Sequence, residues 1–446
     1  MSDPDSNWKT EVGSSLGRIA SRSVVVSINA LRRVGGFCVV VLILACDYAE
    51  SMQTIVERDS AGVAIREYPA DPHLEDLARL RGAEIVSIGA VEGGEAETFN
   101  RIGDLASDSR GRIHVLDAGD QIVDVYDPDG EWILRYGGRG AGPAEFQGAS
   151  LLIPLSDSMG VYDYRNQKVA LFGTDGSLLV TRRWELPIFE FGFPSDLAGI
   201  PGGLAAEFKT GCSMPPPEDR RATWKLLTLG PDGAVRDTVM RRFRGDLIPL
   251  YGEQFCSVIP ALAGSGYEIA VRPDGTVAFA SEQEYEVHLF RLSAYGDEQY
   301  EGSFPPSDRI VRRALDRVAI TGIQIEEYRD RYLVTPEGDP IDRDLMEAIE
   351  QALDSTDLPE GYPHIETLLW DQTGRLWVGR SVAGDISDRT WDIYNDEGNL
   401  EAEVVLPANL ENVLVTGDMV WGTTRDDLGV MYVKGFRIEE TVLAGS

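Results

Sequence analysis

The chain has 446 residues, of which 43% are hydrophobic and 26% are charged, so it can bury a sizeable core and is not an intrinsically disordered tail. It contains 41 Lys and Arg residues and 74 Asp and Glu residues, which gives a formal net charge of −33 at pH 7. That charge repels nucleic acid and anionic lipid headgroups, and we therefore expect no nucleic-acid partner.

The N-terminal segment predicts export. Arg32 and Arg33 precede an apolar run of twelve residues that ends at Ala45, and Cys46 follows. A helix needs about 20 residues to cross a bilayer, so this run fits the apolar region of a secretory signal instead. Ile43-Leu44-Ala45-Cys46 resembles the lipobox of bacterial lipoproteins, in which Cys46 becomes the acylated first residue. The alternatives are a short buried strand or helix, and cleavage without lipid.

These features predict three segments. We expect a lipoprotein-type signal peptide over residues 1–45, a tether over 46–58, and a β-rich domain over 59–446. The mature protein would be exported to the cell envelope and held on its periplasmic or outer-surface side by a lipid anchor at Cys46.

One pattern repeats from about residue 100: a short apolar run, a turn that contains Asp and Gly, a second apolar run, and a polar corner. Asp and Gly provide the backbone angles of tight turns, and the flanking alternation of β-branched or aromatic residues is typical of antiparallel hairpins. The turns are DSRG (108–111), DPDG (127–130), GTDG (173–176), GPDG (230–233), RPDG (272–275), DQTG (371–374) and NDEG (395–398).

The spacing of these turns predicts a six-bladed β-propeller of four-stranded antiparallel blades, because units of about 40 residues are typical of that fold. The expected blades are 99–140, 149–187, 189–240, 258–303, 364–406 and 410–440. The last of them contains only three apolar runs. An early strand, at Gly62–Glu67 or Ile85–Ile88, would supply the fourth and close the ring.

A helical insertion is expected between the fourth and fifth blades, over residues 305–363. The segments IVRRALDRV, from Ile310, and PIDRDLMEAIEQAL, from Pro340, carry apolar residues three to four positions apart, which predicts two amphipathic helices. The insertion would act as a clasp across a blade edge or as a lid over a pocket.

After removal of the signal, two cysteines remain besides Cys46. Cys212 and Cys256 are an even pair in a protein expected outside the cytoplasm, which favours a disulfide over two separate buried thiols.

The acidic and glycine-rich stretch from Arg112 to Phe146 fits no local metal or phosphate motif. With Gly130 at the sixth position of a calcium loop, the first and twelfth positions are Val125 and Tyr136, which cannot serve as the side-chain ligands of that loop. GGRGAGP lacks the Lys-Ser/Thr of a P-loop, the four histidines are scattered, and no G-x-S-x-G occurs within residues 59–446. We therefore assign no catalytic residue and no cofactor. A divalent cation such as calcium, held by carboxylates from different blades, would leave no local motif and stays open.

The repeats resemble the six-bladed propeller proteins related to NHL repeats, which include many bacterial lipoproteins. The matching stretches are DSAGVAIRE, GRIHVLDAGDQIVDVYDPDGEWILRYGGRGAGPAEF, GRLWVGR and WDIYNDEGNL, within residues 59–440. The resemblance implies binding of proteins or other ligands on one face of the propeller. A minority of similar propellers are metal-dependent lactonases or lyases, but no ligand set of those enzymes matches here.

Loops after the second and fourth strands of each blade share one face of a propeller, and their charged side chains are the candidate contacts for a ligand. We expect a non-catalytic binding or scaffold module whose partner is a protein or a small polar ligand; the alternative is a metal-dependent hydrolase or lyase with carboxylates on the axis. The candidate residues are Asp117, Asp120, Arg139, Asp163, Arg165, Lys209, Arg380, Asp385 and Arg425.

Overall fold

The computed structural model describes residues 55–72, 77–94, 96–184, 186, 192–212, 221–243, 247–252, 255–262, 267–280, 284–292, 300–301, 306–333, 343–355, 360–383 and 386–440. It divides into two units, Met1–Ser51 and Met52–Ser446, and all described residues belong to the second. The expected signal peptide, the lipidation site Cys46 and the candidate residue Asp385 lie outside the described residues.

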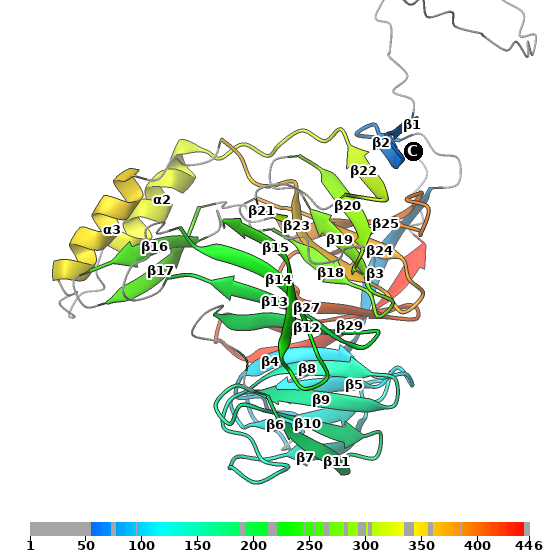
Figure 1. Cartoon of the computed structure of the whole chain (residues 1–446), viewed down its shortest axis with the longest axis vertical. Helices are drawn as coiled ribbons and strands as arrows, with labels where there is room; N and C mark the ends of the chain where they lie inside the picture. Colours follow the sequence, from blue (N-terminus) through cyan, green and yellow to red (C-terminus); the bar gives the residue numbers. More distant parts are fainter. Residues whose placement is uncertain are drawn as a thin grey trace, which may run out of the picture. The chain divides into compact units, whose positions relative to one another are not determined.

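Groups of four antiparallel strands follow one another along the chain and are named sheets 1 to 6 (Figure 1). Sheet 1 has β4 (Ile102–Ser107), β5 (Ile113–Asp117), β6 (Ile122–Tyr126) and β7 (Trp132–Gly137); sheet 2 has β8 (Ala149–Leu155), β9 (Ser158–Asp163), β10 (Lys168–Gly173) and β11 (Leu178–Arg183). Sheet 3 has β12 (Phe193–Ile200), β13 (Gly203–Thr210), β14 (Thr223–Leu229) and β15 (Val235–Phe243), with β21 (Tyr300–Glu301) parallel to β15.

Sheet 4 has β18 (Ile269–Val271), β19 (Thr276–Ala280), β20 (Glu286–Arg291) and β22 (Arg309–Arg313); sheet 5 has β23 (Ile365–Trp370), β24 (Leu376–Arg380), β25 (Asp388–Tyr394) and β26 (Leu400–Pro407). Sheet 6 has β27 (Glu411–Thr416), β28 (Met419–Arg425), β29 (Met431–Glu440) and the early strand β3 (Ala78–Ile88). The expectation of a mostly β protein with four-stranded antiparallel sheets is thus confirmed.

Apolar clusters fill the space between consecutive sheets in cyclic order. The first strands of neighbouring sheets also contact one another, as β27 with β4, β4 with β8, β8 with β12, β18 with β23, and β23 with β27. Radial packing of this kind is typical of a propeller. Cluster members are Leu116 and Phe172 between sheets 1 and 2, Tyr162 and Phe208 between 2 and 3, Trp224 and Phe279 between 3 and 4, Val287 and Val378 between 4 and 5, Trp391 and Val420 between 5 and 6, and Trp421 and Val115 between 6 and 1.

The early strands join two different sheets. β3, which contains Ile85–Ile88, pairs antiparallel with β29 and parallel with β26, so it completes sheet 6 and makes it continuous with sheet 5. Gly62–Glu67, the other segment considered for that role, lies mainly in β2 (Val63–Tyr68), which pairs in parallel with β22 of sheet 4. β1 (Val56–Ser60) forms a hairpin with β2, so the expected tether ends before residue 58.

The prediction of a helix from Ile310, the first of the two helices expected in the insertion, is wrong. Ile310 belongs to β22, which pairs antiparallel with β20 and buries Val311 completely. Apolar residues four apart in a nine-residue window cannot separate a helix from a strand, and the backbone partners offered by β20 and β2 decide here. Sheet 4 therefore runs from Ile269 to Arg313 rather than over 258–303, and the chain leaves it between β20 and β22, where β21 pairs with sheet 3.

Helices α2 (Gly322–Leu333) and α3 (Arg343–Ser355) pack with the hairpin β16 (Leu247–Tyr251) and β17 (Cys256–Pro260), and we call this group the helical module (Figure 1). Helix α3 overlaps the second expected helical segment and continues past its last residue, Leu353, to Ser355. The shared core of the module contains Ile248, Leu250, Ile259, Tyr328, Ala348, Ile349 and Leu353. Neither α2 nor α3, the helices of the described part of the chain, is long and apolar enough to span a membrane.

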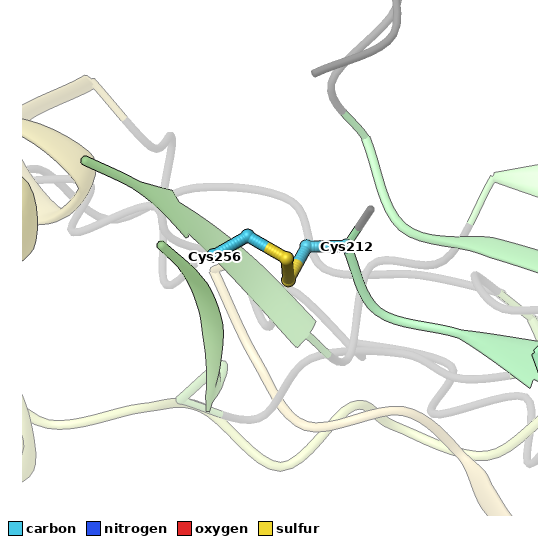
Figure 2. The surroundings of a disulfide bond; sticks show 2 residues. All are labelled: Cys212 and Cys256. Carbon is cyan, nitrogen blue, oxygen red and sulfur yellow. A yellow bond between two sulfur atoms is a disulfide. The ribbon is translucent and has the colours of Figure 1, made fainter. Parts of the chain in front are cut away.

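A disulfide joins the helical module to sheet 3. Cys212 follows β13 and Cys256 begins β17, and their Cα atoms are 6.0 Å apart (Figure 2). The bond therefore links two segments that share no strand pairing in the described residues, since β16 and β17 pair only with each other there.

Candidate ligand-binding site

Two buried aspartates organise the loops of sheets 1 and 2. Asp117, at the end of β5, accepts hydrogen bonds from the backbone N–H groups of Asn100 (2.7 Å), Arg101 (3.1 Å), Gly119 (2.8 Å) and Asp120 (3.0 Å). It thereby ties the segment that leads into β4 to the loop between β5 and β6. A carboxylate that accepts several N–H groups is held firmly in place, so Asp117 positions these loops rather than meeting a ligand directly.

Asp163 has the same role in sheet 2, at the end of β9. Its carboxylate accepts the N–H groups of Gln147 (3.0 Å), Gly148 (3.0 Å), Arg165 (3.1 Å) and Asn166 (3.1 Å). The two sheets thus present equivalent loops, each fixed at its base by one carboxylate.

A cavity of about 390 Å³ lies between these loops. Three arginines line it from separate segments: Arg101 precedes β4, Arg139 lies in the link from β7 to β8, and Arg165 lies in the loop between β9 and β10. We call it the arginine cavity. Its other lining residues are Gly103, Ala118, Gly119, Gln121, Gln147, Gly148, Ala149, Ser150 and Tyr164.

The lining of the arginine cavity contains no acidic side chain. Among the described residues, Arg101, Arg139 and Arg165 form no ion pair. Arg139 donates to the carbonyl of Gly119, Arg101 donates to the carbonyl of Ala118 at 3.4 Å, and Arg165 Nε donates to the Tyr164 hydroxyl at 3.1 Å. These contacts orient the guanidinium groups and leave each of them without a carboxylate partner in the described residues, so the cavity is suited to an anion.

Two further side chains stabilise the walls of the arginine cavity. The buried amide of Gln121 accepts from Ala149 N–H at 2.9 Å and donates to the Ala118 carbonyl at 2.6 Å, which joins sheets 1 and 2 beneath the cavity. The ammonium of Lys168 donates to the carbonyls of Gly142 and Glu145, both at 2.6 Å. Lys168 thus holds the glycine-rich link that carries Arg139, and burial lowers the pKa of this lysine.

A sequence signal for these loops exists but is weak. DAGDQ (117–121) and DYRNQ (163–167) share an Asp at the first position and a Gln at the fifth, and both glutamines adopt positive φ, 63° at Gln121 and 50° at Gln167. Two copies of a five-residue pattern are hard to separate from ordinary turns. Arg101, which belongs to the segment before β4, carries no such signal and was missed.

The structure brings together the candidates from sheets 1 and 2 but not the others. Exposed Asp120, whose carboxylate accepts from Asn100 Nδ2 at 3.2 Å, lies in the β5–β6 loop beside the arginine cavity. Lys209 contacts Glu207 at 3.3 Å on sheet 3, Arg425 donates to the Gly429 carbonyl at 3.2 Å on sheet 6, and Arg380 belongs to a buried network in sheet 5.

That buried network joins sheets 4 and 5. Arg313 Nη1 donates to Asp392 at 2.6 Å and Arg313 Nη2 donates to Glu403 at 2.7 Å, while Arg380 Nη2 donates to the same two carboxylates at 2.5 and 2.6 Å. The Tyr285 hydroxyl donates to Asp392 at 2.6 Å. Since each acid meets two guanidinium groups, the network is internally paired, and we assign Arg380 to structure rather than to ligand contact.

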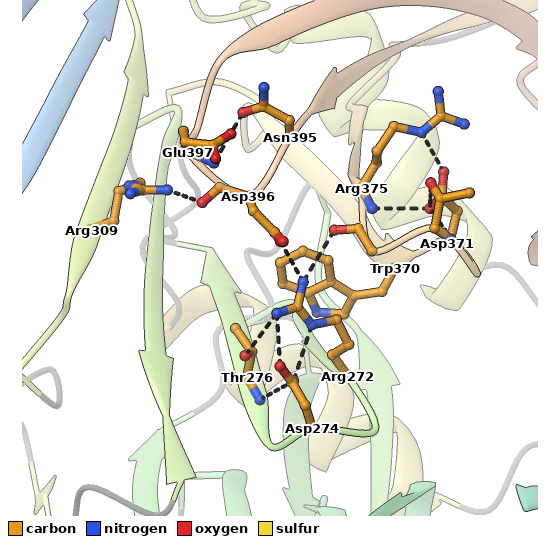
Figure 3. A network of polar contacts seen from close by, with 12 residues as sticks. Arg272, Asp274, Thr276, Arg309, Trp370, Asp371, Arg375, Asn395, Asp396 and Glu397 are labelled. Carbon is orange, nitrogen blue, oxygen red and sulfur yellow. Dashed lines mark hydrogen bonds and ion pairs between the residues drawn. The ribbon is translucent and has the colours of Figure 1, made fainter. Parts of the chain in front are cut away.

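A second link between sheets 4 and 5 involves turns of both sheets (Figure 3). Arg272, which follows β18, donates to Asp274 of its own turn at 2.8 Å and to Asp396 of sheet 5 at 2.5 Å. Its guanidinium lies 4.9 Å from the ring centre of Trp370, whose indole N–H donates to the Ala270 carbonyl at 3.1 Å. Its charge is neutralised by these two acids, in contrast to the guanidinium groups of the arginine cavity.

Two aspartates, Asp104 and Asp196, lie on first strands, which line the axis in a propeller. Asp104 of β4 accepts the N–H of Leu152 of sheet 2 at 2.7 Å. Burial, with a contribution from the negative charge of Asp196, raises the pKa of Asp104 to about 7. Desolvation by the surrounding atoms and the neighbouring Glu207 raise the pKa of Asp196, on β12, although its side chain is exposed. No group of three or more His, Cys, Asp or Glu side chains suited to a metal ion occurs in the described residues.

No family model matches this chain, and no curated protein matches it. Solved structures do resemble it. A crystal structure of an exported protein from Bacteroides fragilis is 11% identical, with 84% of this chain and 99% of that chain covered and a TM-score of 0.44. A member of the DUF4221 family from Bacteroides vulgatus is 7% identical, with 82% and 100% covered and a TM-score of 0.43. A calcium-binding protein, regucalcin, from Agrobacterium tumefaciens is 14% identical, with 84% and 97% covered and a TM-score of 0.35. These values assign the chain to no family, and the propeller topology rests on its own strand pairing and core.

Proposed function

We propose that this protein is an exported six-bladed β-propeller that binds a small anionic ligand in the arginine cavity and performs no catalysis. The observation that carries the proposal is that Arg101, Arg139 and Arg165 meet at one cavity without any acidic lining residue. The net charge of −33 repels anions at long range, but three guanidinium groups at one cavity without an acidic lining residue attract an anion locally.

The geometry of the arginine cavity supports a small organic anion. Its volume of about 390 Å³ falls within the range of roughly 300–1,000 Å³ typical of small-molecule sites. Each guanidinium offers a planar set of N–H donors that matches a carboxylate or phosphate. Because Asp117, Asp163 and Lys168 fix the surrounding loops, little conformational entropy is lost when a ligand binds.

The six blades are part of the proposal. The core clusters follow the order of sheets 1 to 6 and return to sheet 1, which favours a closed ring in which β3 serves as the outer strand of the last blade. Radial closure protects the sheet edges and holds the loops of sheets 1 and 2 beside each other. The helical module is then an attachment to the ring, held through the disulfide.

Citrate binding measured by isothermal titration calorimetry tests the function. We expect binding by the wild-type protein, and a loss of affinity of about tenfold or more in Arg139→Gln and in Arg165→Gln, because a hydrogen bond to a charged group contributes roughly 1.5–3 kcal/mol. Arg425→Gln is the matched control, since Arg425 is an exposed arginine of sheet 6 that contacts only a carbonyl in the described residues. Citrate binding that is equal in the control and in both cavity variants would overturn the proposal.

The lipid anchor is tested separately. Fractionation of cells should find the wild-type protein in membranes and the Cys46→Ser variant in the soluble fraction, because the acyl chains on Cys46 provide the membrane affinity. Membrane retention of the variant at the wild-type level contradicts lipidation at Cys46 and leaves the assignment of the ligand site untouched.

A further inference from the structure

An exposed aromatic side chain lies next to the arginine cavity. Phe193, the first residue of β12, packs edge-on against Tyr164, with ring centres 5.4 Å apart and an interplanar angle of 79°. Tyr164 lines the cavity, yet Phe193 keeps 56% of its surface exposed. Sheet 3 therefore places an exposed apolar ring against a ring that lines the cavity, and we call this pair the aromatic ledge (Tyr164 and Phe193).

Tyr164 links the aromatic ledge to the guanidinium of Arg165, and both of these residues line the cavity. Arg165 donates to the Tyr164 hydroxyl at 3.1 Å, and its guanidinium carbon lies 5.8 Å from the Tyr164 ring centre. An anionic group paired with Arg165 would therefore place the rest of its molecule close to these rings. Phe193 would lose exposed surface on contact with a second flat apolar group, and aromatic pairs contribute beyond the area that they bury.

We propose that the ligand of the arginine cavity is an aromatic anion, with a carboxylate or phosphate held by Arg139 and Arg165 and a planar ring packed on the aromatic ledge. This inference rests on the proposed function, since it requires that anions bind in the arginine cavity. It goes further by naming the chemical class of the ligand, which the arginines alone leave open between aliphatic and aromatic acids.

The test compares phthalate with succinate by isothermal titration calorimetry, because both carry two carboxylates and only phthalate has a ring. We expect the wild-type protein to bind phthalate about fivefold more tightly, in line with roughly 0.5–1.5 kcal/mol for an aromatic pair. Phe193→Leu should weaken the binding of phthalate to about the level of succinate and leave the affinity for succinate unchanged. Phe193→Tyr should retain the preference.

Trp132→Leu is the control for loss of an exposed aromatic elsewhere, since Trp132 is 49% exposed on β7 and does not line the cavity. It should keep the wild-type preference for phthalate. Equal binding of both acids by the wild-type protein, or an unchanged preference in Phe193→Leu, would contradict the proposal that the aromatic ledge binds the ligand. Neither result would contradict anion binding in the arginine cavity. If neither phthalate, succinate nor citrate binds, the proposed function itself fails, and this inference fails with it.

Discussion

Replacement of Arg313 by Met is expected to lower the free energy of unfolding by about 3 kcal/mol or more, the magnitude for removing one partner from a buried ion pair. The side chains of Arg313 and Asp392 are 1% and 0% exposed, so the substitution leaves buried negative charge with fewer donors. Arg380 and Tyr285 still contact Asp392, so we expect a loss of stability at the lower end of the roughly 3–5 kcal/mol that follows from breaking a buried ion pair. The midpoint of denaturant-induced unfolding measures it.

Arg81→Met is the matched control for Arg313→Met. Arg81 pairs with Asp388 at 3.0 Å, but the two side chains are 61% and 38% exposed, and exposed pairs contribute about 0–1 kcal/mol. If both substitutions shift the unfolding midpoint by the same amount, the buried network between sheets 4 and 5 does not stabilise the fold in the way that its burial indicates.

Removal of the disulfide, in a Cys212→Ser and Cys256→Ser double variant, is expected to destabilise the helical module by about 4 kcal/mol. The bond closes a loop across a sequence separation of 44, and chain entropy alone predicts this magnitude. Hydrogen exchange should increase in α2, α3, β16 and β17, whose core in the described residues is separate from the clusters between the sheets. Sheets 1 and 2 should exchange as in the wild-type protein.

Reduction of the wild-type protein provides the control for the double variant. A reductant should reproduce the faster exchange of the helical module in the wild-type protein and change nothing further in the double variant. Exchange rates of α2 and α3 that are equal in oxidised and reduced protein would show that the module is held by packing alone.

Local turn chemistry explains why much of the fold could be predicted. In the turn at 127–130, Asp127 accepts the N–H groups of Asp129 at 3.0 Å and Glu131 at 2.9 Å, and Gly130 adopts a φ of 87°. Both properties depend on residues within five positions, so the hairpins are visible in sequence. The glycine has a second role that is not local, because a Cβ atom there would clash with Val86 of β3.

Strand β22 shows where such prediction fails. Its residues were expected to be helical, and only pairing with β20 and β2, which lie about 20 and 240 residues away along the chain, makes them a strand. The anchoring roles of Asp117 and Asp163 were missed for a similar reason. In sequence, an acidic residue in a loop is equally compatible with an exposed carboxylate and with a carboxylate that accepts backbone N–H groups. Which of the two occurs depends on whether the preceding segment passes close to the carboxylate.

By itself, the sequence determined the β class, the approximate limits of most four-stranded groups, the placement of Arg139 and Arg165 in connecting loops, and the pair of cysteines that could meet. These depend on turns and on alternation within short windows. Only the tertiary structure decided that Arg101, Arg139 and Arg165 share one cavity, that Phe193 packs on Tyr164 of its lining, and that β3 completes sheet 6. The physical reason is that radial packing brings together segments that are far apart along the chain. No local sequence pattern indicates which charged side chains remain without an ion-pair partner after such packing.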